Sequence, residues 1–161
     1  MAIAIKKFRW ISIILVVFLL SACTEEEVQH FSSKEEALDS FIEKNDVKGN
    51  IDQILTKRGD ELLVVQTKED TFFVGERIQN QKGHYAQRIS DNFSLGLGGA
   101  WELTTKANNK YTIYLDQSKK DMNYTSFSNG EYEMALVEGH KITKNIPEFI
   151  NAIKEVEVIK D

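Results

Sequence analysis

The stretch Leu62-Leu63-Val64-Val65 carries apolar side chains at four consecutive positions. Because successive side chains of a β-strand point to opposite faces of a sheet, a strand of this composition has to be covered on both faces by other elements. We therefore predict that Leu62 to Val65 forms a central strand of the fold.

The sequence around this stretch, from Val47 to Gly139, consists of short β-rich runs separated by turn signals. The signals recur about every 8–12 residues, which is typical of an antiparallel meander. Asn129-Gly130 is the clearest of them, since both residues tolerate the positive φ that a type I′ hairpin turn requires. Runs such as Tyr111-Thr112-Ile113-Tyr114-Leu115 alternate in polarity and predict strands with one buried face.

A helix is predicted before the β-rich region and another after it. Ser33 and Glu36 match a capping box, and apolar residues follow at helical spacing, which predicts a helix from about Lys34 to Asn45. Pro147, the only proline, has Asn145 before it and Glu148 after it, an arrangement typical of a helix start.

The apolar residues Ile146, Phe149, Ile150 and Ile153 would give this second helix one apolar face. The following Glu155-Val156-Glu157-Val158 alternates in polarity instead, which predicts a short closing strand. Together these patterns predict an α+β fold: an antiparallel β-meander or curved sheet with an N-terminal and a C-terminal helix packed on it. Residues 33–161 are expected to form a single domain.

The N-terminal residues 1–22 have the layout of an export signal. Lys6, Lys7 and Arg9 are followed by an apolar run from Trp10 to Leu20, whose length falls in the usual signal-peptide range of about 7–15 residues. Such a run is too short to cross a bilayer, which takes roughly 20 apolar residues.

The run closes with Leu20-Ser21-Ala22-Cys23, and Cys23 is the only cysteine of the chain. This motif resembles the lipobox of bacterial lipoproteins, in which signal peptidase II cuts before a cysteine that carries diacylglycerol. The resemblance implies that residues 1–22 are removed and that Leu20, Ser21 and Ala22 are recognised by the peptidase. It also implies that Cys23 carries the lipid on the outer side of the cell membrane. An uncleaved N-terminal anchor and an ordinary secretory signal with an unused thiol are the alternatives.

Residues 23–32 would then form a lipidated tether that contains Glu25-Glu26-Glu27. The predicted signal segment holds three basic and no acidic residues, so the rest of the chain has a formal charge of −8. An acidic domain is repelled by anionic lipid and by nucleic acid, and we therefore expect no nucleic-acid partner. A membrane-proximal protein, a basic peptide or a small ligand remains compatible with this charge.

Gly98, Gly99 and Trp101 are the candidate ligand-cleft residues. The glycines resemble a phosphate-binding loop only superficially, because strand pattern resumes at Trp101 where such a loop needs a helix N-terminus. A bent connection between two hairpins is the favoured interpretation, with a cleft beside Trp101 as the alternative.

The sequence offers no other candidate site. His30, His84 and His140 lack the spacing of metal ligands, and no nucleophile elbow or Ser-His-Asp pattern is present. Glu131 and Glu133 share one face of a predicted strand, but that face is the solvent-exposed one. We therefore predict no catalytic residue, no metal and no cofactor.

The layout as a whole resembles the small surface lipoproteins of Gram-positive bacteria. The leading functional hypothesis is a non-enzymatic binding or accessory domain held at the membrane by diacylglyceryl-cysteine. One alternative is an extracytoplasmic hydrolase that uses carboxylates. Another is a self-protection lipoprotein that captures a cationic protein or peptide.

Overall fold

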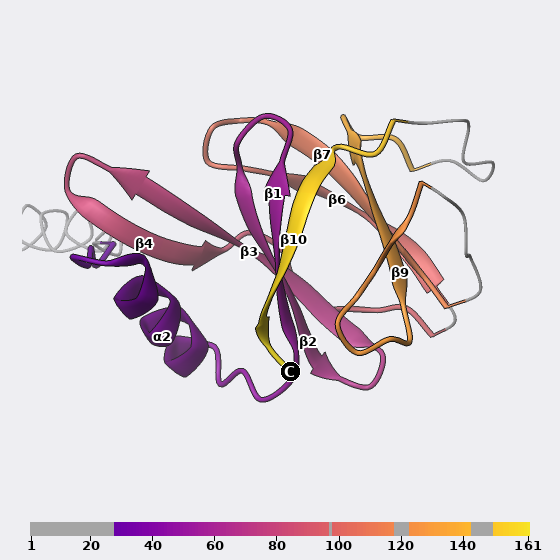
Figure 1. Cartoon of the computed structure of the whole chain (residues 1–161), viewed down its shortest axis with the longest axis horizontal. Coiled ribbons are helices and arrows are strands. Elements are labelled where there is room, and N and C mark those ends of the chain that lie inside the picture. The colour runs from indigo at the N-terminus through magenta and orange to yellow at the C-terminus, as the bar shows by residue number, and fades with distance from the viewer. Residues whose placement is uncertain (1–27, 97, 118–122, 143–149) are drawn as a thin grey trace, which may run out of the picture.

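The computed structural model describes residues 28–96, 98–117, 123–142 and 150–161. In these ranges the chain forms one α-helix and ten β-strands (Figure 1). They are, in chain order, α2 (Lys34–Lys44), β1 (Ile51–Thr56), β2 (Glu61–Lys68), β3 (Thr71–Asn80), β4 (Gly83–Arg88), β5 (Phe93–Ser94), β6 (Gly98–Thr104), β7 (Lys110–Asp116), β8 (Thr125–Ser126), β9 (Glu133–Glu138) and β10 (Ile153–Lys160).

The strands form two antiparallel sheets. The first has the order β10-β1-β2-β3-β4, with β5 also paired to β3, and the second has the order β6-β7-β9-β8. The prediction of a central strand is confirmed, because β2 lies between β1 and β3 and its residues Leu62 to Val65 are fully buried.

The two faces of β2 contribute to two different hydrophobic cores. Leu62 and Val64 pack between the sheets, while Leu63 and Val65 pack on the side of α2. Figure 1 shows the resulting layers, with α2 against the β3–β4 hairpin and the second sheet on the far side of the first. The helix, the strands and both cores lie within residues 34–160, so a chain that begins at Thr24 contains all of them.

The predicted α+β class is wrong. The described chain is predominantly β, with the single helix α2 and two sheets in place of one meander packed by two helices. The turn signals gave the hairpins, but the local pattern does not specify which hairpins share a sheet. Each face of the first sheet needs a cover, and the second sheet covers one face where we expected a helix.

The N-terminal helix is confirmed as α2. The hydroxyl of Ser33 accepts a hydrogen bond from the Glu36 backbone N–H at 3.1 Å, as the capping box requires. The helix crosses β3 at Gly75, where an added Cβ would lie 2.6 Å from Cζ of Phe41. Glycine therefore lets the Phe41 ring lie directly on the strand.

The predicted C-terminal helix is not found in the described part of its range. Residues 143–149, including Pro147, lie outside the described residues, and Ile150 is 81% exposed in an irregular segment. Ile153 belongs to β10, where it pairs with Thr56 of β1. The predicted closing strand at Glu155 to Val158 is confirmed as part of β10. By pairing with β1, this strand supplies hydrogen-bond partners for the edge of β1 that does not face β2.

The hairpin at Asn129-Gly130 is confirmed, although the turn type is different. It joins β8 to β9, and Gly130 has φ +70°, while Asn129 is not among the residues with positive φ. The Phe127 N–H donates to the Tyr132 carbonyl at 2.8 Å, so the loop is longer than a two-residue type I′ turn. Among the described residues, no helix has both the length and the apolar composition to cross a bilayer.

Candidate functional site

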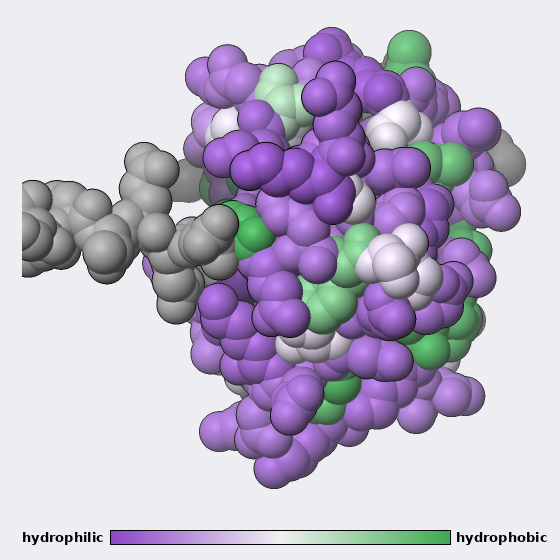
Figure 2. Space-filling view, turned by 90° about the vertical axis from the view of Figure 1, so that its left-hand side faces the viewer, coloured by the Kyte–Doolittle hydropathy of each residue, from purple (hydrophilic) through white to green (hydrophobic). Residues whose placement is uncertain are grey.

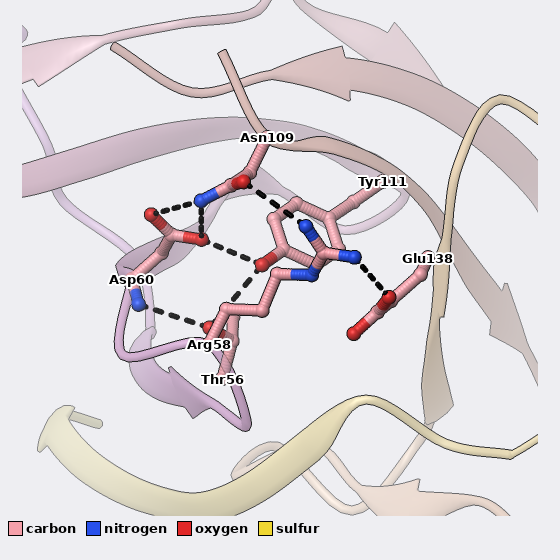
Figure 3. A network of polar contacts seen from close by, with 6 residues as sticks. All are labelled: Thr56, Arg58, Asp60, Asn109, Tyr111 and Glu138. Atoms are coloured by element: carbon pink, nitrogen blue, oxygen red, sulfur yellow. Dashed lines mark hydrogen bonds and ion pairs between the residues drawn. The ribbon is translucent and has the colours of Figure 1, made fainter. Parts of the chain in front are cut away.

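A polar cluster joins the two sheets at one end of the sandwich (Figure 3). We call it the inter-sheet cluster, and it consists of Thr56, Arg58, Asp60, Asn109, Tyr111 and Glu138. The Asp60 carboxylate accepts hydrogen bonds from Tyr111 Oη at 2.6 Å and from Asn109 Nδ2 at 3.0 and 3.2 Å. Asp60 thus fastens the β1–β2 turn of the first sheet to β7 and its preceding turn in the second.

Arg58 crosses the outside of this cluster, as Figure 3 shows. Its guanidinium donates to Asn109 Oδ1 at 3.3 Å and to Glu138 Oε2 at 2.6 Å. The side chains of Arg58 and Glu138 are 52% and 43% exposed, so solvent screens this ion pair and its contribution to stability is small.

The chemistry of the inter-sheet cluster suits a structural role. Burial, together with the hydrogen bond to Asp60, raises the pKa of Tyr111 to about 12, so the phenol keeps its proton at neutral pH. The buried Glu76 also has a raised pKa, mainly because of desolvation and in part because of the charge of Asp60. Its carboxylate accepts from the Lys106 backbone N–H at 2.8 Å. The carboxylates of Asp60 and Glu76 therefore both accept hydrogen bonds from other groups of the protein.

The other buried carboxylic acid among the described residues, Asp52 of β1, lies at the opposite end of this strand from Thr56. Its Oδ2 accepts from the Ser128 backbone N–H at 2.9 Å, and its Oδ1 has no partner among the described residues. Burial raises the pKa of this carboxyl, and the hydrogen bonds from Ser128 offset only part of that effect. Asp52 is fully enclosed, so a substrate has no approach to it.

The predicted cleft residues Gly98, Gly99 and Trp101 have structural contacts. The Trp101 ring stacks on Phe93 at a centroid distance of 4.2 Å and packs against the core between the sheets. Gly98 has φ +155°, and an added Cβ there would lie 2.9 Å from the Leu115 carbonyl oxygen. These contacts favour the bent connection over a ligand loop.

The other residues singled out in the sequence are dispersed. His30 contacts Tyr85 edge-on, His84 pairs with Phe31 through the backbone, and His140 contacts Leu103 and Thr104. Among the described residues, no group of three His, Cys, Asp or Glu side chains is placed to hold a metal ion. The residues of the predicted lipobox, Leu20, Ser21, Ala22 and Cys23, lie outside the described residues.

A pocket between α2 and β4 is the best candidate for a binding site. We call it the α2–β4 groove, and its volume is about 430 Å³. The segment before α2, the helix and the strand each contribute to its lining, which comprises Val28, Gln29, Phe31, Ser40, Phe41, Lys44, Asn45, Ala86, Gln87 and Arg88. Among the described lining residues, two carry a positive charge and none carries a carboxylate, on a domain whose formal charge is strongly negative.

Arg88 is held in a fixed position at the groove. Its guanidinium lies 4.4 Å from the centroid of the Phe73 ring, a favourable cation–π distance. Nε donates to the Ser90 carbonyl at 2.6 Å, and an Nη donates to Asn92 Oδ1 at 2.9 Å. The cation is therefore preorganised for an anionic group.

Sequence reasoning missed this groove. Its lining comes from three segments around residues 30, 42 and 87, and none of them carries a recognisable motif. Comparison of the chain with family models, with curated proteins and with solved structures finds no match.

Proposed function

We propose that this chain is an extracytoplasmic lipoprotein, anchored to the cell membrane through diacylglyceryl-Cys23, whose domain binds a ligand without chemical turnover. The preformed α2–β4 groove is the observation that carries this proposal. It combines the phenyl ring of Phe41 with the fixed cation of Arg88, and ligand sites typically pair apolar surface with a few placed polar groups.

The position of the groove suits a membrane-proximal partner. Val28 lines the groove and follows Cys23 by five residues. At about 3.6 Å per extended residue, this part of the groove would be held within ~18 Å of the lipid-bearing cysteine. A membrane protein, or a ligand released at the membrane, would meet the groove at high local concentration.

The hydrolase alternative requires two carboxylates that face a substrate. Asp60 and Glu76 are near enough to influence each other electrostatically. Both nevertheless accept hydrogen bonds from neighbouring protein groups, and Glu76 is only 3% exposed. For this reason we favour binding over hydrolysis.

Lipid anchoring is tested by Cys23→Ser, with Ser21→Ala as the matched control. In bacteria fed an alkyne-labelled fatty acid, we expect the native chain and Ser21→Ala to carry label and to sediment with membranes. Cys23→Ser should lose the label. A Cys23→Ser protein that stays labelled would show that the lipid is not on this thiol.

Binding at the groove is tested by a charge reversal, Arg88→Glu. The control is Lys68→Glu, which makes the same charge change at an exposed position outside the groove. We expect a ligand co-purified from membranes to be retained by the native chain and by Lys68→Glu and to be lost from Arg88→Glu. Equal retention by all three chains would exclude the groove as the binding site.

A further inference from the structure

β4 is the last strand of the first sheet, and its outer edge already pairs with one residue outside the sheet. The Phe31 N–H donates to the His84 carbonyl at 2.8 Å, and the His84 N–H donates to the Phe31 carbonyl at 2.9 Å. This reciprocal pair is the hydrogen-bonded pair of an antiparallel ladder. The edge of β4 is therefore competent to accept a strand.

The same edge offers two further positions in the groove. Since outward-facing backbone groups recur at every second residue, Ala86 and Arg88 direct their N–H and C=O groups to the same side as His84. The register of Phe31 with His84 would place Gln29 opposite Ala86. The described segment 28–30 nevertheless does not pair with β4, and Gln29 lines the groove instead.

Charge and size indicate what could fill these two positions. Side chains directly opposite each other in an antiparallel pair lie on the same face, so a residue paired with Arg88 would extend its side chain beside the guanidinium. A carboxylate there would lie beside the guanidinium of Arg88, and the described lining residues include no acid. Ala86 carries only a methyl group, which leaves room for the neighbouring ligand residue.

The surface around the groove argues against a broad apolar interface. Figure 2 views the end of the molecule that carries α2 and the β3–β4 hairpin, and hydrophilic side chains predominate on it. The apolar patches visible there are small and separate. Recognition through backbone hydrogen bonds and one charge pair suits such a surface better than hydrophobic association.

We propose that the α2–β4 groove binds an extended acidic segment of a partner polypeptide, which adds a short antiparallel strand to β4 and places a carboxylate against Arg88. This inference specifies the ligand class of the proposed binding site and does not depend on the lipid anchor. If Cys23 carries lipid but the groove does not bind acidic peptides, this inference is refuted while the proposal of a lipid anchor stands.

The probe is a fluorescently labelled, terminally blocked pentapeptide of alternating valine and glutamate, titrated into the purified full chain in detergent micelles. The control peptide has lysine in place of glutamate. We expect saturable binding of the acidic peptide only, with slower amide hydrogen exchange at residues 86–88. Absence of saturation up to about 1 mM, equal binding of the lysine peptide, or protection elsewhere in the chain would overturn the proposal.

Two variants test the two kinds of contact. Arg88→Ala should weaken binding about tenfold or more, as expected for a hydrogen bond to a charged group. Ala86→Pro removes an N–H that points away from β3 and so breaks no β3–β4 hydrogen bond. Proline is tolerated on edge strands, so binding should fall while the sheet persists. Ala86→Ser keeps the N–H and should bind normally. Unchanged binding by Ala86→Pro would exclude strand addition.

Two further outcomes would also overturn the proposal. Binding that appears only after residues 24–27 are deleted would assign the groove to Glu25-Glu26-Glu27 of the same chain. Stronger, Arg88-dependent binding of anionic lipid vesicles than of the acidic peptide would assign it to lipid headgroups. Circular dichroism and thermal unfolding of each variant identify any loss of binding that results from a failure to fold.

Discussion

The hydrogen bond between Tyr111 and Asp60 should stabilise the packing of one sheet on the other. The Tyr111 ring is fully buried, and its hydroxyl donates to Asp60 Oδ2 at 2.6 Å. Tyr111→Phe keeps the ring and removes this donor. Because hydrogen bonds to charged groups contribute about 1.5–3 kcal/mol, we expect the free energy of unfolding at neutral pH to fall by ~2 kcal/mol.

The effect of this substitution should depend on pH in a defined direction. The pKa of Tyr111 is raised by burial and by Asp60 from 10.0 to about 12 in the folded state. Below pH 10 both states keep the proton, so the stabilisation is complete. Between pH 10 and 12 the unfolded chain loses the proton first, and stability falls as pH rises. Two pKa units correspond to about 2.7 kcal/mol, so the difference between native chain and variant should nearly vanish by pH 12.

Urea unfolding of the chain from Thr24 onward measures this difference. Trp101 is the only tryptophan in that part of the sequence, and its stacking on Phe93 makes its fluorescence a probe of folding. Asp60→Asn and the double variant complete a mutant cycle, in which the two changes should cost less together than separately. A difference that stays constant from neutral to high pH, or strictly additive costs, would refute the coupling of Tyr111 to Asp60.

Three other predictions concern stability. Gly75→Ala should lower the free energy of unfolding by about 1–3 kcal/mol in urea titrations, because the new Cβ would lie 2.6 Å from Cζ of Phe41. An unchanged free energy of unfolding would mean that α2 shifts freely on the sheet. Burial raises the pKa of Asp52 above 3.8, so the stability of the fold falls as pH rises from that value through the folded-state pKa. Asp52→Asn should therefore flatten this part of a plot of Tm against pH. An unchanged slope would contradict the raised pKa of Asp52. Burial alone would raise the pKa of Glu61, but hydrogen bonds from Arg77 and Lys34 outweigh this effect and lower that pKa. Glu61→Gln should therefore lower the free energy of unfolding near pH 7 by about 1–3 kcal/mol in thermal unfolding. A stabilised variant would show that the fold does not need the charge of Glu61.

The sequence predicted those parts of the fold that depend on near neighbours. The Ser33 cap, the strand at Leu62 to Val65 and the hairpin around Gly130 each arise from residues a few positions apart. The C-terminal helix was predicted from the spacing of four apolar residues, and for Ile153 the pairing with β1 prevailed over that local pattern. A short run of spaced apolar residues is compatible with a helix and with a strand, and only the presence of a pairing strand decides between them.

The candidate site could not be predicted in the same way. The glycines stood out because they superficially resemble a phosphate-binding loop, and Trp101 because it lies beside them in the sequence, yet their contacts serve packing. Arg88 and Ala86 had no distinguishing neighbours in the sequence. They define the α2–β4 groove only because the helix and the N-terminal segment are placed beside the edge of β4.

The sequence by itself led to the prediction of an export signal, through its resemblance to a lipobox, and it fixed the charge of the chain and the positions of several strands, among them β2, β7 and β10. These properties depend on composition and on contacts over a few residues. The division into two sheets, the coupling of Asp60 to Tyr111 across 51 positions and the α2–β4 groove were decided only by the tertiary structure. Long-range pairing selects among many segments of similar hydrophobicity, and only the packed chain satisfies their hydrogen bonds and burial together.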